Sequence, residues 1–112
     1  MSINSRSKGK RGELEAAEFL RQHGFRASRG QQFKGGADSQ DLVHNVAGVH
    51  FEVKRTESLN VYKALDQATE DAKWTAESPL SRDIPVVLHR RSHREWVAIL
   101  PADALMALLR AR

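Results

Sequence analysis

The sequence predicts a mixed α/β domain in which helices flank a central sheet, with the element order α-β-β-β-α-β-β-α. Three segments carry the 3.6-residue apolar period of amphipathic helices. Between them lie short segments that are continuously apolar or that alternate apolar and polar side chains, as strands do. The chain has 112 residues, 40% of them apolar and 29% charged, which is typical of one globular domain and too short for two.

The predicted elements follow one another without a repeat or a linker. The first helix depends on an apolar stripe that includes Leu14, Ala17 and Leu20, and it ends before Gly24, where a helix C-cap belongs. In chain order we expect a flexible basic arm over 1–8, a helix over 9–23, a strand over 25–29, a loop over 30–40, strands over 41–44 and 49–55, a helix capped by Asn60, strands over 86–88 and 96–100, and a helix over 102–109.

Three strands and a loop follow the first helix. Apolar and polar residues alternate over 25–29, and the glycines within 30–40 permit the unusual backbone angles of a loop. A turn joins the strands over 41–44 and 49–55, so we expect these two strands to pair as a hairpin.

The second half of the chain is predicted to contain two helices and two strands. Asn60 has a side chain suited to a helix N-cap, and the apolar residues after it follow a helical period. The strand over 86–88 is continuously apolar, and a basic turn leads from it to the strand over 96–100. Three apolar residues of the last helix are expected to be buried: Leu105, Leu108 and Leu109.

The charge distribution favours a polyanionic partner. Eighteen Lys and Arg against fourteen Asp and Glu give a net charge of +4, and residues 1–36 hold eight basic and three acidic residues. This excess favours nucleic acid over a membrane surface. No apolar run reaches the ~20 residues that span a bilayer. Because the chain has no cysteine, disulfides, thiolate metal sites and cysteine nucleophiles are excluded, and we expect a cytoplasmic protein.

Two carboxylates and a lysine carry the strongest chemical signal. Glu52 and Lys54 share one face of a strand, and the expected hairpin brings Asp41 beside Glu52. Converging carboxylates repel each other unless a cation lies between them, and oxygen ligands suit Mg²⁺ or Mn²⁺. A neighbouring lysine can hold a water molecule and stabilise charge on a phosphate, as phosphodiester hydrolysis requires. His50 shares this face, and we expect a structural role for it.

An exposed ion pair is the common alternative for Glu-x-Lys on a strand, and such a pair stabilises a protein little. Three observations favour a site. Asp41 and Glu52 stand in apolar strand sequence, where carboxylates are unusual. A loop containing glycines precedes Asp41, and the surroundings are strongly basic.

The motif Asp41…Glu52-x-Lys54 resembles the PD-(D/E)xK nuclease signature, with Gln40 where proline is common. Further segments resemble the archaeal-type Holliday junction resolvases and their phage-encoded members: 8–13 at the start of a helix, Gly24-Phe25, Arg29-Gly30, and the loop up to Leu42. The resemblance extends over about 8–100. It implies a restriction-endonuclease-like fold, with 9–112 as one nuclease domain.

The resemblance also implies an activity and a set of site residues. A protein of this family is a Mg²⁺-dependent endodeoxyribonuclease, with Mn²⁺ as a substitute, that cuts four-way (Holliday) junctions symmetrically as a homodimer in DNA recombination or repair. The implied catalytic residues are Glu13, Asp41, Glu52, Lys54 and Gln67, of which Glu13, Asp41 and Glu52 hold the metal. The residues alone leave two alternatives: Glu13 as a first-turn glutamate favoured by the helix dipole, and Gln67 as a plain surface glutamine.

Basic residues near the predicted site are expected to bind DNA phosphates: Lys8, Lys10, Arg11, Arg29, Lys34 and Arg55. The last helix and the strand containing Trp96 are candidates for a dimer interface, with core packing as the alternative. Two other functions remain open: a less structure-selective phage or restriction-like nuclease of the same fold, and a noncatalytic nucleic-acid-binding module. The resemblance places the protein in the cytoplasm of a bacterial or phage-infected cell.

Overall fold

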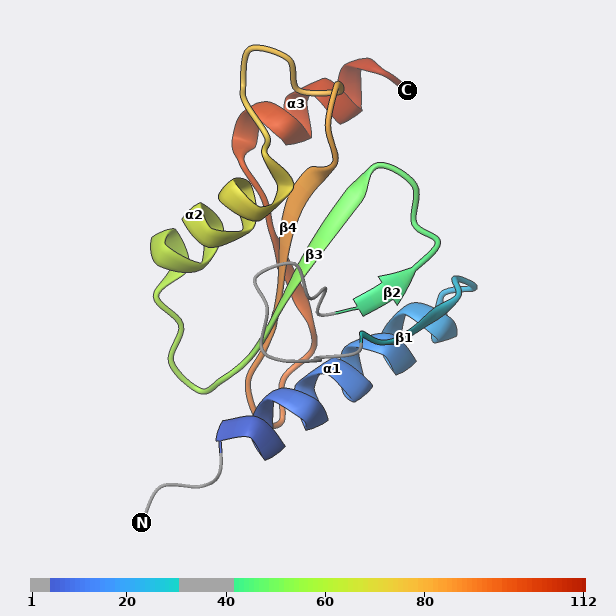
Figure 1. Ribbon diagram of the computed structural model, residues 1–112, viewed down its shortest axis with the longest axis vertical. Helices are drawn as coiled ribbons and strands as arrows, with labels where there is room; N and C mark the ends of the chain where they lie inside the picture. The colour runs from blue at the N-terminus through green and yellow to red at the C-terminus, as the bar shows by residue number, and fades with distance from the viewer. Residues whose placement is uncertain (1–4, 31–41) are drawn as a thin grey trace.

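The fold is organised around two neighbouring parallel strands that a helix connects (Figure 1). The computed structural model describes residues 5–30 and 42–112, with side chains from residue 9 onward. Its elements are α1 (Ser5–Gln22), β1 (Ala27–Arg29), β2 (Leu42–His44), β3 (Val49–Arg55), α2 (Val61–Ala72), β4 (Ile84–Arg90), β5 (Val97–Ile99) and α3 (Ala102–Arg110). The predicted α/β class and element order are therefore confirmed.

Strand β4 lies in the middle of a three-stranded sheet, parallel to β3 and antiparallel to β5. Helix α2 makes the crossover from β3 to β4 and packs against both strands. In the parallel register Glu52 is level with Val87, so these two side chains point to the same face of the sheet. This is the face that α2 covers.

The alternation of side chains along β3 and β4 divides the core into two parts. One face packs against α1, whose Ala16 and Leu20 are buried in the larger cluster. The other face presents Val87 to Ala64 and Ala68 of α2. Because the alanines are small, α2 lies close to the sheet, and the polar side chains of β3 on this face are brought up to the helix.

Helix α1 begins at Ser5, four residues before the predicted start, so residues 5–8 are helical rather than part of the arm. Glu13 therefore lies beyond the first turn, and the alternative of a first-turn glutamate is wrong. The predicted C-cap is confirmed. Gly24 has φ +89°, and the N–H groups of Gly24 and Phe25 donate to the carbonyls of Arg21 and Leu20, as in a Schellman motif.

The buried stripe of α1 differs from the predicted one at its beginning. Leu14 is 48% exposed, whereas Glu13 is only 9% exposed. Gly12 also faces the sheet, because a Cβ atom at this position would lie 2.6 Å from the Cβ of Arg55 in β3. The helix thus approaches β3 through a glycine and carries a carboxylate, rather than a leucine, on its inner side.

Strand β2 pairs with β1 in antiparallel register, with Val43 level with Ser28. Within the described residues no ladder joins β2 to β3, so the expected hairpin of 41–44 with 49–55 is wrong. The physical reason is visible at Asn45, whose backbone N–H donates to the carbonyl of Arg26 and whose Oδ1 accepts from the N–H of Arg26. These bonds extend the pairing with β1.

Helix α3 docks on the core through alanines rather than leucines. Ala104 and Ala107 are buried, whereas the leucines predicted to be buried are 40–45% exposed: Leu105, Leu108 and Leu109. That prediction is wrong because the two alanines, three residues apart, form the inner stripe and leave the larger side chains outside.

Candidate functional site

The polar face of β3 meets the side of α2 and brings three of the predicted site residues together. Glu52 is 6% exposed, although it is a carboxylate in the middle of a strand. The Nζ atom of Lys54 lies 4.0 Å from Oε1 of Glu52 and donates a hydrogen bond of 3.3 Å to Oε1 of Gln67. Gln67 therefore contacts the lysine of the predicted site, as expected for a supporting residue.

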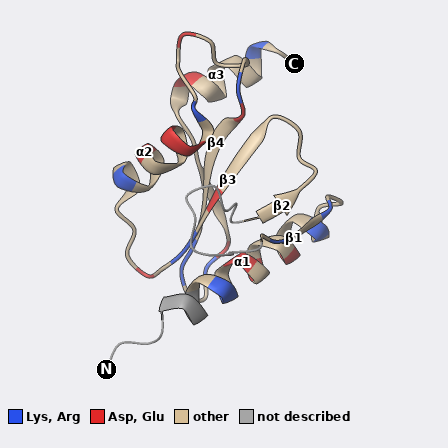
Figure 2. Cartoon of the chain, viewed as in Figure 1, with Lys and Arg blue, Asp and Glu red and all other residues tan. Residues whose placement is uncertain are grey.

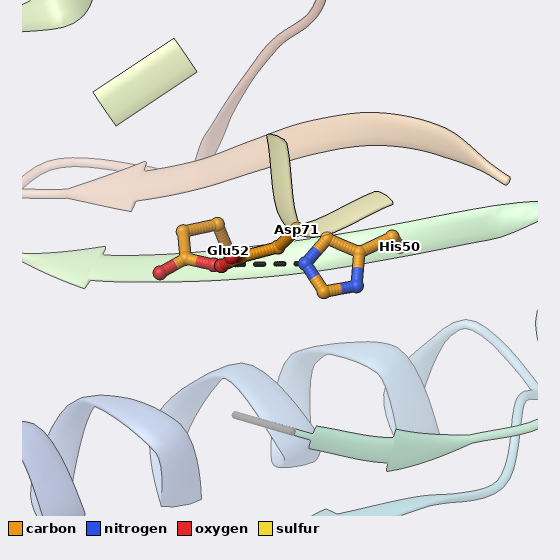
Figure 3. A group of neighbouring side chains, drawn as sticks. All are labelled: His50, Glu52 and Asp71. Atoms are coloured by element: carbon orange, nitrogen blue, oxygen red, sulfur yellow. Dashed lines mark ion pairs between the residues drawn. The ribbon is translucent and has the colours of Figure 1, made fainter. Parts of the chain in front are cut away.

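Two further side chains lie beside Glu52 (Figure 3). The Nε2 atom of His50 is 3.6 Å from Oε2 of Glu52. Asp71, in the last turn of α2, points to the same place, and one ligand atom from each of the three residues lies within 4.8 Å of the other two. Two oxygens and one nitrogen from protein are thus close enough to be drawn onto one cation.

The carboxyl group of Asp71 is influenced by its neighbour Glu52. Burial raises the pKa of Asp71, and the negative charge of Glu52 and a hydrogen bond with its carboxylate raise it further. A cation placed between the two carboxyl groups would favour the charged form of Asp71.

Glu13 approaches this region from α1 and is held by Arg29. The Nε atom of Arg29 donates to Oε1 of Glu13 over 2.8 Å. Burial raises the pKa of Glu13, the Arg29 guanidinium opposes this rise, and the charge of Glu52 adds to it. Glu13 is therefore near enough to Glu52 for their charges to interact. Within the part of the chain that the structure describes, however, it is not among the carboxylates that converge with His50.

Some predicted site residues lie outside the described residues, namely Asp41 and Lys34, and the side chain of Lys8 does so as well. Their assigned roles stay predictions.

Basic residues gather where the carboxyl ends of β3 and β4 meet the amino-terminal half of α1 (Figure 2). Lys10 and Arg11, in the amino-terminal half of α1, are exposed, as a phosphate contact requires. Arg55 is instead engaged within the protein: its Nε donates to Glu15 over 3.0 Å, and its Nη1 lies 3.3 Å from Glu57. Its expected contact with DNA competes with these ion pairs.

A groove of about 640 Å³ lies between α1 and the segment that follows β4, and none of His50, Glu52 and Asp71 lines it. Arg11, Arg90 and Trp96 are among the residues that line it, together with Glu15 and Glu18. Three of its arginines are paired with three of its glutamates: Arg21 with Glu18, Arg90 with Glu15, and Arg94 with Glu95. The lining therefore carries both charge signs, and it includes no residue of β3.

The comparisons with known proteins do not identify a family. No protein-family model matches the chain, and no curated protein sequence matches it. The assignment of a function therefore depends on the residues and their geometry. In the part of the chain described by the structure, no helix is long and apolar enough to cross a membrane.

Sequence reasoning assigned His50 a structural role and did not consider Asp71. A signal for both was present. His50 has the same parity as Glu52 and Lys54 along β3, and Asp71 follows Gln67 by one helical turn. What the sequence lacked was the register between α2 and β3, which arises from the packing of Ala64 and Ala68 against the sheet.

Proposed function

We propose that this chain is a metal-dependent endonuclease that hydrolyses DNA phosphodiester bonds, and that its preferred substrate is a four-way junction. The observation that carries this proposal is the buried carboxylate of Glu52 with Lys54 at 4.0 Å and further ligand atoms beside it. Burying a carboxylate is costly unless it is paired or binds a cation. The motif resemblance and the basic excess of the chain support DNA as the substrate.

The donor set fits a divalent cation, because the buried carboxylate of Glu52 and the exposed carboxylate of Asp71 lie beside each other. Such an ion, when bound, polarises a phosphate oxygen and lowers the pKa of bound water. Glu52 holds the ion. Lys54 donates toward the phosphate oxygen on which negative charge develops, and Gln67 keeps the ammonium group of Lys54 in place through its Oε1 atom.

The surrounding surface supports a nucleic-acid substrate. Lys10 and Arg11 are exposed on α1, Arg11 lines a groove together with Arg90 at the carboxyl end of β4, and each of the two can neutralise a backbone phosphate. In this proposal Arg29 keeps Glu13 oriented through the 2.8 Å hydrogen bond, so its first task is to position a carboxylate rather than to bind DNA.

The proposal includes a homodimer, because two cuts on opposite strands require two sites and each chain provides one. Exposed apolar side chains on α3 and β5 support an interface there: Val97, Leu105, Met106, Leu108 and Leu109. Strand β5 is also at the edge of its sheet.

The test is a cleavage assay on four-way junction, flap and linear duplex DNA of the same sequence, with Mg²⁺, with Mn²⁺ and with EDTA. We expect cleavage only with a divalent ion, and loss of cleavage in Glu52→Gln and in Asp41→Ala. Asp66→Asn, an exposed carboxylate on α2, is the matched control and should retain activity.

Each outcome separates one function from another. Full activity in EDTA or in Glu52→Gln would contradict the metal site. Equal cleavage of all three substrates would leave the less structure-selective nuclease. Junction binding without cleavage under any metal condition would leave the noncatalytic nucleic-acid-binding module.

A further inference from the structure

Side-chain contacts between β3 and α2 recur at matching intervals along the two elements. Lys54 contacts Gln67, and two residues earlier on the strand Glu52 contacts Asp71, one turn later on the helix. Two residues of a strand span about 6.8 Å and one helical turn spans about 5.4–6 Å. Alternate residues of β3 can therefore each contact a residue of α2 one turn further along the helix. His50 is the next residue on this face of the strand, and its Nε2 points back toward Glu52 (Figure 3).

These contacts place a nitrogen ligand beside two oxygen ligands. The ligand atoms of His50, Glu52 and Asp71 lie within 4.8 Å of one another, and ligand atoms at about 2.1 Å from one ion lie at most about 4.2 Å apart. Only two of three ligands can lie on opposite sides of the ion, and adjacent ligands lie about 3 Å apart. Side-chain rotations that move the ligand atoms by about 1 Å would therefore bring all three onto one ion. Asp71 is exposed, whereas Glu52 is buried, so the cluster opens to solvent on the helix side.

We propose that His50 and Asp71 complete a metal site with Glu52, and that this site selects a divalent first-row transition metal over Mg²⁺. Imidazole nitrogen is a good ligand for transition metals, whereas Mg²⁺ prefers oxygen and keeps its own water. The inference rests on the proposed function for its role in catalysis. It adds one nitrogen ligand and a further carboxylate, both from described residues, to the oxygen-only ligand set that the sequence predicts.

The experiment measures metal binding by the full chain without DNA. Mn²⁺ is the probe, because it is paramagnetic and stands lowest in the Irving–Williams order, which makes it the most demanding test of selectivity. Affinities for Mn²⁺ and for Mg²⁺ are obtained by titration, and pulsed electron paramagnetic resonance of the Mn²⁺ complex detects a directly bound imidazole nitrogen. The spectrum of the unaltered protein tests the ligand assignment even if a variant folds poorly.

We expect Mn²⁺ to bind at least about tenfold more tightly than Mg²⁺ and to show nitrogen coupling. His50→Gln should abolish the nitrogen coupling and reduce the preference for Mn²⁺, with a smaller change for Mg²⁺, because glutamine offers an oxygen in place of nitrogen. Asp71→Asn should weaken both ions by about tenfold or more. The matched controls are His93→Asn, in which asparagine tolerates the positive φ of 65°, and Asp66→Asn.

Three results would overturn the inference: Mn²⁺ bound without nitrogen coupling, unchanged selectivity in His50→Gln, or no Mn²⁺ binding at millimolar concentration. A cleavage assay on the same samples separates this failure from failure of the proposed function. Cleavage with Mg²⁺ that is indifferent to His50→Gln and Asp71→Asn would reject these ligands and keep the nuclease. A nitrogen-coupled Mn²⁺ site without cleavage of any DNA would keep the ligands and reject the nuclease.

Discussion

Lys54 is the side chain whose loss should most clearly separate turnover from binding. Its ammonium group is held by Gln67 and Glu52, and the proposed function assigns it the stabilisation of charge that develops on a phosphate. We expect Lys54→Ala to lower the single-turnover cleavage rate about 10²–10³-fold. The dissociation constant for a junction should change little, because the interaction is made mainly in the transition state.

Lys63→Ala, which removes an exposed lysine from α2, is the control and should leave both quantities unchanged. If Lys54→Ala weakened junction binding as much as turnover, Lys54 would be a phosphate contact rather than a catalytic group.

Arg29 should matter more for stability at neutral pH than at acidic pH. Burial raises the pKa of Glu13 above its usual 4.5, and Arg29 partly offsets this rise. A carboxyl group with a raised folded-state pKa binds its proton more tightly in the folded chain, so stability falls as the pH rises above the usual value. Arg29→Gln should raise that pKa further and extend the loss of stability to higher pH.

We therefore expect Arg29→Gln to lower the free energy of unfolding by about 1–3 kcal/mol at pH 7.5 and by clearly less at pH 4.5. Urea denaturation at both pH values checks this, with Arg26→Gln, at an exposed position, as the control. An equal loss at both pH values would show that Arg29 acts through packing alone.

At the scale of elements, the approach of α1 to β3 depends on Gly12. A methyl group at this position would lie 2.6 Å from the Cβ of Arg55, which real side chains do not tolerate. Gly12→Ala should displace the helix and lower the free energy of unfolding by about 1–3 kcal/mol, as overpacking does. Because Glu13 follows directly, the cleavage rate should fall as well.

Gly9→Ala is the matched control, since nothing lies within 4 Å of a Cβ atom there and alanine is the better helix former. It should be neutral or raise the free energy of unfolding by up to about 1 kcal/mol. Similar effects of the two substitutions would contradict the close approach of helix and strand at Gly12.

Elements with a local signal were predicted well. The Oδ1 atom of Asn60 accepts from the N–H of Lys63, as its predicted N-cap requires, and β3 has the predicted bounds. Signals that depend on a distant partner failed. The pairing of β2 with β1 depends on Asn45 finding Arg26, and the exposure of Leu105 depends on which side of α3 meets the core.

The difference between local signals and signals from distant partners also explains which residues of the candidate site were predicted. Glu52 and Lys54 share a face by strand geometry alone, so their neighbourhood was predictable. Asp71 joins them only because α2 crosses the sheet at one particular register, which no local pattern contains. The restriction-endonuclease-like fold and the role of Asp41 stay predictions.

At the scale of the whole molecule, the exposed apolar side chains of α3 suggest self-association. We expect the protein to be a dimer at micromolar concentration in light scattering. Leu105 and Leu109 lie one helical turn apart. The double substitution Leu105→Lys and Leu109→Lys should convert the dimer to a monomer, because a charge in an apolar interface must be desolvated. Leu80→Lys, at another exposed apolar position, is the control and should leave the dimer intact.

If the wild-type protein were a monomer, both free and on DNA, the proposal of a symmetric resolvase would be wrong, and a nuclease that cuts one strand at a time would remain. If the dimer persisted with both lysine substitutions, the interface would not include α3.

The equal spacing of the contacts along β3 and α2 has a consequence for how this chain tolerates insertions. One extra residue between Ala64 and Asp71 would rotate everything after it by about 100° and turn Asp71 away from Glu52. The same insertion between β3 and Asn60 would leave the helix free to dock through its alanines as before. The segment between β3 and Asn60 can therefore vary in length. The number of residues between Ala64 and Asp71 is fixed, because any insertion there would separate Asp71 from Glu52.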